Sequence, residues 1–251
     1  MTTGELWITH YSVCSWMSAK NWDDYLRTME VVLEDRLMKL DDNDPARRKA
    51  DTQKGEGDFI VQFKEREDSR WIWGTFEKTK IEIEIDHYKA GKDSFGRERK
   101  NKCKIFIPER MTFGPDLRKV IELFRLGNES FGAFYAYADF KKAICAKKPS
   151  TPSLDISREL LGVFWLTYFG PAYCSFFGRD RLLHLQQATD GPADGITLQL
   201  AESPSQVPDN SRGTLEREIA PESFAGSGGV KERGEHALTL AQLSANASQA
   251  L

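Results

Sequence analysis

The sequence lacks the short motifs that mark common catalytic and nucleotide-binding sites. It contains no glycine-rich phosphate loop, no GxGxxG fingerprint, no HExxH zinc motif and no GxSxG nucleophile turn. The four histidines lie far apart along the chain, and their spacing indicates no metal site: His10, His87, His184 and His236. We therefore predict a protein that is not an enzyme, with no catalytic residues, no cofactor and no bound metal.

Cysteine is scarce and basic residues are not in excess. Cys14, Cys103, Cys145 and Cys174 form no CxxC pair, which argues against a zinc site and against a compact disulfide framework. Lys and Arg together number 35 against 38 for Asp and Glu, so the formal net charge is −3. Because a dedicated nucleic-acid-binding protein usually has a clear basic excess, we expect no direct binding to nucleic acid.

No segment has the pattern of a secretory signal or a membrane span. Met1–Trp16 has no basic start followed by an apolar run. The longest uncharged run, Leu160–Gly178, is long enough to cross a bilayer, but Gly170-Pro171 and several polar side chains interrupt it. We therefore expect no membrane insertion and a reducing, cytoplasmic location.

The first part of the chain predicts a strand and a long amphipathic helix. Leu6–Tyr11 is rich in β-branched and aromatic residues, which favours a strand. Asn21 can cap a helix, and apolar residues then recur mostly three and four apart from Trp22 to Leu40. This spacing predicts one continuous helix over Asn21–Leu40.

Strands dominate the middle of the chain. After a polar loop, the pattern predicts four strands in succession: Phe59–Lys64, Trp71–Glu77, Ile81–His87 and Lys102–Ile107. The third alternates strictly, so its isoleucines face a core and its acidic residues face the other side. The short connections favour an antiparallel meander.

The rest of the chain mixes helices and strands. The predicted elements are a helix over Pro115–Leu126, a strand over Phe131–Phe140, a helical turn over Ser157–Leu161, strands over Val163–Phe169 and Ile196–Ala201, and a helix over Leu215–Phe224. This order predicts a single α+β domain over residues 1–225, with a mainly antiparallel sheet and several packed helices. Residues 226–251 begin with a Gly-rich linker and continue as a flexible or weakly helical tail.

One pattern leaves a catalytic alternative open. Asp86 ends the alternating strand, and Glu98-Arg99-Lys100 precedes the next strand. In restriction-endonuclease-type nucleases, two carboxylates in this order hold a divalent metal and the lysine helps to activate water. Glu98 and Lys100 lie in a polar stretch expected to be a loop, whereas a rigid metal site requires support from regular structure.

Acidic residues gather in two places. Each group alone is typical of a solvated surface, but together they could attract a basic partner and speed its capture. On the strand the acids lie on one face about 7 Å apart, since every second residue points to the same side. The candidate interface residues are Glu82, Glu84 and Asp86 on the strand, and Asp23, Asp24, Glu34 and Asp35 on the helix.

Gly162–Tyr173, followed by Phe176-Phe177, resembles the signature block of bacterial immunity proteins from polymorphic toxin systems, specifically the family numbered fifty-two. Ile196–Pro204 and Leu215–Phe224 are similar to that family's closing strand and helix. The resemblance implies a cytosolic antitoxin encoded beside its toxin. Members are typically paired with toxins of restriction-endonuclease fold, often delivered by type VI secretion. Because the block is structural in that family, the resemblance implies no catalytic residue in this chain.

We therefore predict an immunity protein that binds and neutralises a cognate nuclease toxin. Two alternatives stay open at this stage. The first is a metal-dependent nuclease that uses Asp86, Glu98 and Lys100. The second is a non-enzymatic adaptor protein with no toxin partner.

Overall fold

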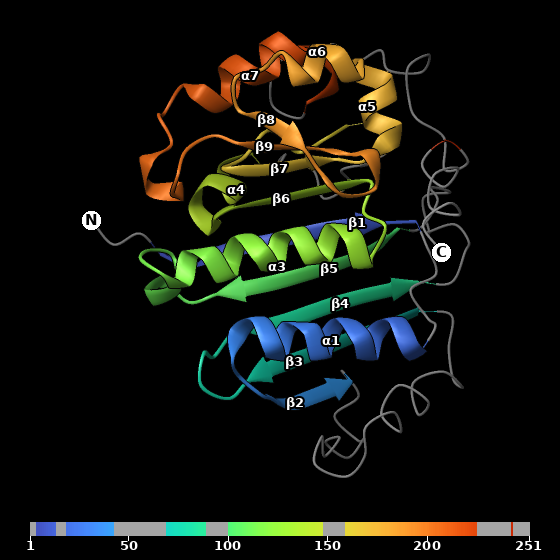
Figure 1. Cartoon of the computed structure of the whole chain (residues 1–251), viewed down its shortest axis with the longest axis vertical. Helices are drawn as coiled ribbons and strands as arrows, with labels where there is room; N and C mark the ends of the chain where they lie inside the picture. The colour runs from blue at the N-terminus through green and yellow to red at the C-terminus, as the bar shows by residue number, and fades with distance from the viewer. Residues whose placement is uncertain are drawn as a thin grey trace.

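Nine strands form the centre of the computed structural model, which describes residues 4–13, 19–42, 69–88, 100–147, 159–224 and 242 (Figure 1). Their bounds are β1 Leu6–Ser12, β2 Leu37–Asp42, β3 Ser69–Phe76, β4 Glu82–Tyr88, β5 Asn101–Ile107, β6 Tyr135–Phe140, β7 Leu166–Phe169, β8 Ala188–Asp190 and β9 Ile196–Gln199. They form one sheet in the order β2-β3-β4-β5-β1-β6-β7-β9-β8, and every neighbouring pair is antiparallel. The first strand therefore lies between β5 and β6, near the middle of the sheet.

Six α-helices accompany the sheet in the described ranges. They are α1 Ala19–Leu33, α3 Asp116–Ser130, α4 Lys141–Lys147, α5 Pro171–Phe177, α6 Arg179–Leu183 and α7 Ser211–Ile219. Four short 3₁₀ turns occur as well: η1 Glu109–Met111, η2 Pro192–Asp194, η3 Pro204–Gln206 and η4 Pro221–Ser223. The predicted α+β class, with a mainly antiparallel sheet and several packed helices in one domain, is confirmed.

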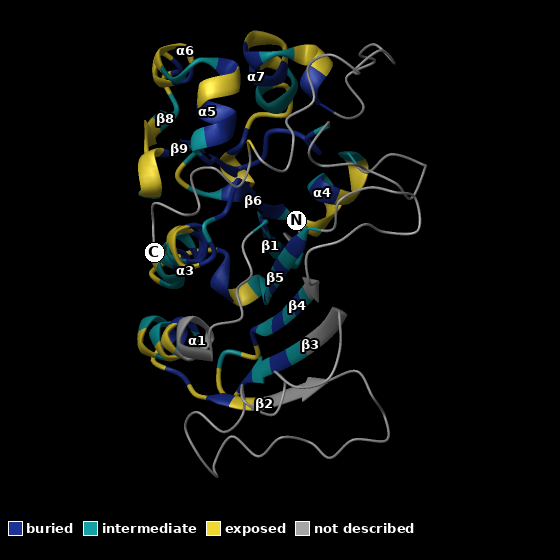
Figure 2. Ribbon diagram, turned by 90° about the vertical axis from the view of Figure 1, so that its right-hand side faces the viewer, coloured by how far each residue is buried: buried dark blue, intermediate teal, exposed yellow. Residues whose placement is uncertain are grey.

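The sheet has a separate hydrophobic core on each face. On one face α1 and α3 lie side by side (Figure 1) and cover inward side chains such as Ile8, Ile83 and Ile105. On the other face α4 to α7 pack on β6, β7 and β9, around a core that includes Tyr135 and Phe169. This asymmetry leaves the β3-β4-β5 part of the second face without a covering helix among the described residues (Figure 2).

The structure confirms most of the strands predicted from sequence. The predicted strands at Leu6–Tyr11, Trp71–Glu77, Ile81–His87 and Lys102–Ile107 correspond to β1, β3, β4 and β5, each within two residues at either end. The predicted strand at Phe59–Lys64 lies outside the described residues, as do 226–251 apart from Gln242. Among the helices in the described ranges, none combines the length and the apolar character that crossing a membrane requires.

The single long helix predicted over Asn21–Leu40 is wrong beyond Leu33. The helix α1 ends there, and Glu34 has a positive φ of 52°, which turns the chain. Leu37 and Leu40 continue the helical spacing in the sequence, but both lie in β2, an edge strand that pairs with β3. A long-range contact explains the change, because the Asp35 carboxylate binds the β3–β4 turn.

Predictions for the later part of the chain need correction as well. Of the predicted strand Val163–Phe169, only Leu166–Phe169 is a strand. The predicted helical turn over Ser157–Leu161 is not helical in its described part, where Leu160 forms an isolated parallel bridge with Phe224. Other predicted bounds differ as well: α3 continues to Ser130, β6 begins at Tyr135, β9 ends at Gln199, and α7 spans Ser211–Ile219 before η4. The sequence patterns also missed α4, α5, α6 and β8.

Candidate functional site

The three strand acids lie on β4 and point away from the core that α1 and α3 cover. The intervening Ile83 and Ile85 are buried, as the alternation predicted. Across the antiparallel pair, Glu84 is opposite Lys104 and Asp86 is opposite Lys102. Lys104 Nζ lies 2.8 Å from Glu84 Oε1, and Lys102 forms an ion pair with Asp86.

The three acids of β4 therefore do not form an uncompensated row of negative charge. Two of the three acids have a lysine partner on β5. Glu82 lies opposite Phe106 on β5 and has no ion-pair partner among the described residues. The β4–β5 surface consequently has alternating charges, and only Glu82 adds an uncompensated one.

Aromatic side chains share this face of the sheet with the charges. The Trp7 and Phe106 rings meet edge to face with their centroids 5.5 Å apart. Trp7 Nε1 donates to Glu5 at 2.8 Å, and Lys141 at the start of α4 lies 5.0 Å above the Trp7 ring. The result is a half-buried surface of paired charges and aromatic rings, and aromatic residues are enriched at protein interfaces.

The described acids at and after α1 differ in their surroundings. Glu34 is 80% exposed at its side chain and pairs with Lys119 on α3 at 2.9 Å, and this hydrogen bond lowers the pKa of the Glu34 carboxyl. Asp24 is exposed. Asp23 is part of α1, but its side chain lies outside the described structure.

Asp35 has a structural role. It is only 6% exposed, and its carboxylate accepts from Lys78 N at 2.9 Å, Thr79 N at 2.7 Å and Thr79 Oγ1 at 2.6 Å. Burial alone would raise the pKa of this carboxyl, but the hydrogen bonds from Thr79, Lys78 and Arg36 outweigh burial and lower it. Asp35 fastens the end of α1 to the β3–β4 turn, so it is poorly placed to meet a partner.

The residues of the nuclease alternative are only partly described. Asp86 is paired with Lys102, Lys100 directly precedes β5, and Glu98 lies outside the described residues. Within the described ranges, no three His, Cys, Asp or Glu side chains lie close enough together to hold a metal ion.

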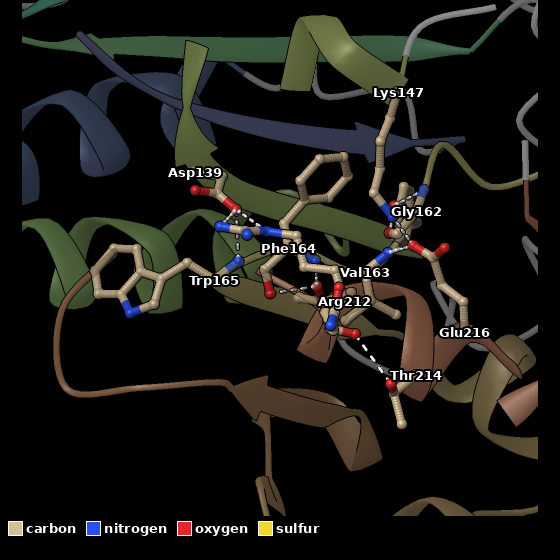
Figure 3. A network of polar contacts seen from close by, with 12 residues as sticks. Asp139, Lys147, Gly162, Val163, Phe164, Trp165, Arg212, Thr214 and Glu216 are labelled. Atoms are coloured by element: carbon tan, nitrogen blue, oxygen red, sulfur yellow. Dashed lines mark hydrogen bonds and ion pairs between the residues drawn. The ribbon is translucent and has the colours of Figure 1, made fainter. Parts of the chain in front are cut away.

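A denser polar cluster lies where α7 meets β6 and α4 (Figure 3). Arg212 donates from Nε to Asp139 Oδ2 at 2.8 Å and its Nη2 lies 2.7 Å from the same oxygen. Asp139 is completely buried. One turn further along α7, Glu216 forms an ion pair with Lys147 of α4 and accepts from Val163 N at 2.7 Å.

This cluster explains the local structure of the Gly162–Tyr173 block. Four successive backbone N–H groups, at 162–165, donate to side chains rather than to a neighbouring strand. Their acceptors are Tyr135 Oη at 3.3 Å, Glu216 Oε1 at 2.7 Å, Thr167 Oγ1 at 2.8 Å and Asp139 Oδ2 at 3.0 Å. Buried N–H groups require hydrogen-bond partners. Because these side chains accept the hydrogen bonds, residues 162–165 can be buried without being part of a strand.

The electrostatics of the cluster fit a structural clamp. Burial raises the pKa of Asp139, and Arg212 and the hydrogen bonds from Trp165 and Phe140 oppose this. Burial also lowers the pKa of Lys147, which Glu216 opposes. Asp139 and Arg212 form one ion pair of the cluster, and Lys147 and Glu216 form the other.

Sequence reasoning missed one exposed feature, the turn between β8 and β9. This turn is Gly191–Gly195, and Ala193 and Asp194 in its centre have positive φ angles of 49° and 59°. The letters Gly-Pro-Ala-Asp-Gly are a turn signal that could have identified it.

Comparisons with known proteins give a fold relationship. No protein-family model matches the chain, and no curated protein matches it in sequence. Among solved structures, a protein of the type VI secretion system of Pseudomonas aeruginosa is similar, with a TM-score of 0.61 and 15% sequence identity. The similarity covers 98% of this chain and 83% of that chain. At this identity the likeness shows that the two chains share a fold.

Proposed function

We propose that the chain is a non-enzymatic immunity protein of a type VI secretion system, which binds and neutralises a cognate toxin in the cytoplasm. The observation that carries the proposal is the fold shared with a type VI secretion protein over 98% of the chain. The resemblance of Gly162–Tyr173 to an immunity-protein block supports it independently. From the same resemblance, we propose a nuclease of restriction-endonuclease fold as the toxin.

The chemistry of the described residues supports binding rather than turnover. The Asp139–Arg212 and Glu216–Lys147 pairs hold the backbone of 162–165, and Asp35 holds a turn. The half-buried rings and paired charges around β4 and β5 are suited to contact with another protein.

The test of the function is neutralisation of the toxin encoded by the neighbouring gene. Cells that express this toxin should die alone and survive when the chain is co-expressed, and the two proteins should purify as a complex. Survival without a complex, or a complex without survival, contradicts the proposal. The adaptor alternative predicts no protection.

The absence of enzymatic activity needs a separate test. Purified chain should leave DNA and RNA intact in the presence of Mg²⁺ or Mn²⁺. Glu98→Ala and Asp86→Asn provide the matched variants. Cleavage that disappears in both variants would establish the nuclease alternative instead.

The β4–β5 surface offers a test of where the toxin binds. If the β4 acids attract a basic toxin, Glu82→Gln combined with Glu84→Gln should slow association, most strongly at low salt. Lys102→Gln combined with Lys104→Gln is the control of opposite sign on the neighbouring strand and should speed association. Unchanged association rates in both double variants would exclude this surface from the interface.

A further inference from the structure

The β4–β5 surface differs from an ordinary solvated sheet face. No helix of the described ranges covers it (Figure 2), yet its side chains are only partly exposed. The Lys104 and Glu84 side chains are 24% and 16% exposed, and the neighbouring rings of Trp7, Trp73 and Phe106 are half-buried. Half-buried rings beside paired charges are features of a surface that another protein can cover.

The strand register arranges this surface in rows that run across the strands. Side chains directly opposite each other on neighbouring strands point to the same side of the sheet. One row therefore contains Glu84 and Lys104, and the next contains Asp86 and Lys102. In both rows the acid belongs to β4 and the lysine belongs to β5, so a negative strand lies beside a positive strand.

This arrangement is complementary to a second copy of itself. A twofold axis parallel to the strands, midway between β4 and β5, leaves each row at the same height and exchanges the two strands. When two faces are related by this axis, Glu84 of each copy meets Lys104 of the other, and Asp86 meets Lys102. An ammonium has three donors and a carboxylate several acceptor sites, so a pair within one chain leaves both groups able to bind a second partner.

The third row fits the same axis by size as well as by charge. From β3 to β1 it contains Thr75, Glu82, Phe106 and Trp7. The axis exchanges Thr75 with Trp7, so a large ring of each copy meets a small side chain of the other. It also brings Glu82 over Phe106, close to Lys104, whose Nζ lies 5.9 Å from the centroid of that ring. Glu82, which has no ion-pair partner within the described ranges, thereby gains a cation from the second copy.

We propose that the β4–β5 surface, with β3 and β1 at its sides, binds a second copy of this chain in a symmetric dimer with the two sheets stacked face to face. This inference does not rest on the immunity function. Stacked sheets lie about 10 Å apart, with their strands within about 30° of each other, so the rows of the two copies can meet.

The size of the surface predicts a weak dimer. Four strands of about seven residues cover roughly 450 Å² per copy. A standard interface buries about 800 Å² per partner. We therefore expect the dimer to form at micromolar or higher concentrations, and we expect salt to weaken it because charges contribute to the contact.

Sedimentation equilibrium over about 10 µM to 1 mM, the range that a weak interface requires, measures self-association of the full chain. The wild-type chain should dimerise, with a Kd that rises with salt. The charge reversals Glu84→Lys and Lys104→Glu should each raise Kd at least about tenfold, because like charges then meet at two symmetric places. Arg118→Glu, at an exposed residue of α3, is the charge control and should leave Kd unchanged.

Combinations of the two reversals identify the interface. Under the twofold axis, a Glu84→Lys copy is complementary to a Lys104→Glu copy, so their equimolar mixture should form a heterodimer with about the wild-type affinity. The double variant Glu84→Lys with Lys104→Glu keeps a pair of opposite charges within the chain. It should dimerise with itself but not with the wild-type chain. If circular dichroism shows that a single reversal does not fold, the double variant alone decides.

The outcomes are decisive for the dimer and separate from the immunity function, which neutralisation of the toxin tests. A wild-type chain that stays monomeric over this range overturns the inference. Protection of β4 and β5 from hydrogen exchange by the neighbouring-gene toxin would then assign the surface to that toxin. A dimer that both reversals leave intact, or a double variant that dimerises equally well with the wild-type chain, also overturns it, because the copies would then meet elsewhere.

Discussion

Removal of the Arg212 guanidinium should be strongly destabilising. Asp139 is 0% exposed and the Arg212 side chain is 16% exposed, so the pair is buried and largely shielded from water. Loss of one partner from a buried pair costs about 3–5 kcal/mol, because the other charge is left uncompensated. Asp139 keeps two backbone donors, Trp165 N at 3.0 Å and Phe140 N at 2.8 Å. We therefore expect Arg212→Leu to cost about 3 kcal/mol in free energy of unfolding, the lower end of that range.

The free energy of unfolding lost in Arg212→Leu should increase with pH. Burial raises the pKa of Asp139 above its ordinary value, and Arg212 opposes this rise. Without Arg212 the pKa rises further, so between the unfolded and folded pKa values the native state binds more protons than the unfolded state. Stability then falls as pH rises through this window. The deficit of Arg212→Leu relative to wild type should therefore be larger at about pH 8 than at about pH 5.

Urea unfolding at both pH values measures this difference. Arg217→Leu is the matched control, because Arg217 is on the same helix, is exposed and donates to Thr214 Oγ1 at 3.2 Å. It should change stability by less than about 0.5 kcal/mol. An Arg212→Leu cost below about 1 kcal/mol, or an equal cost at both pH values, would refute the assignment of a buried ionised pair.

Three further changes test the packing. Trp165→Ala should cost about 3–5 kcal/mol by urea unfolding, because the ring is fully buried and Nε1 donates to Ala201 O at 2.9 Å; a much smaller loss would place the ring at the surface. Gly195→Ala should lower Tm, since its Cβ would lie 2.3 Å from the Tyr168 ring; an unchanged Tm would show that the ring can move. Burial lowers the pKa of His10 to about 4, so the unfolded state binds more protons and stability should fall as pH drops from about 6.5 to about 4. His10→Gln should make stability depend less on pH over this range. An unchanged pH dependence in this variant would show that His10 is not responsible.

Local sequence patterns predicted which side chains of a strand face the core, but not which side chains on the neighbouring strand they contact. The alternation at 81–86 correctly assigned the isoleucines to the core. It could not show that Lys102 and Lys104 neutralise Asp86 and Glu84, because that depends on the register between two strands. The acidic character of this surface was therefore overestimated from the sequence.

Two other errors also have long-range causes. Leu37 and Leu40 have helical spacing, but the hydrogen bonds between Asp35 and the β3–β4 turn end the helix before them. The apolar run at 163–165 has the composition of a strand, but side chains from distant elements accept the hydrogen bonds of Val163 N and Trp165 N. No window of local sequence contains these partners. The candidate interface acids stay a prediction, with Asp35 as the member whose surroundings fit that role least.

The position of β1 has a consequence for synthesis on the ribosome. Leu6–Ser12 is made before both of its partners, Asn101–Ile107 and Tyr135–Phe140, which follow much later in the chain. At about 5–20 residues per second, translation leaves this apolar strand without its neighbours for about 5–20 s. During that interval its backbone and side chains are open to other nascent chains and to chaperones. The two parts of the sheet are joined through this strand, because β1 is the strand that pairs with both β5 and β6.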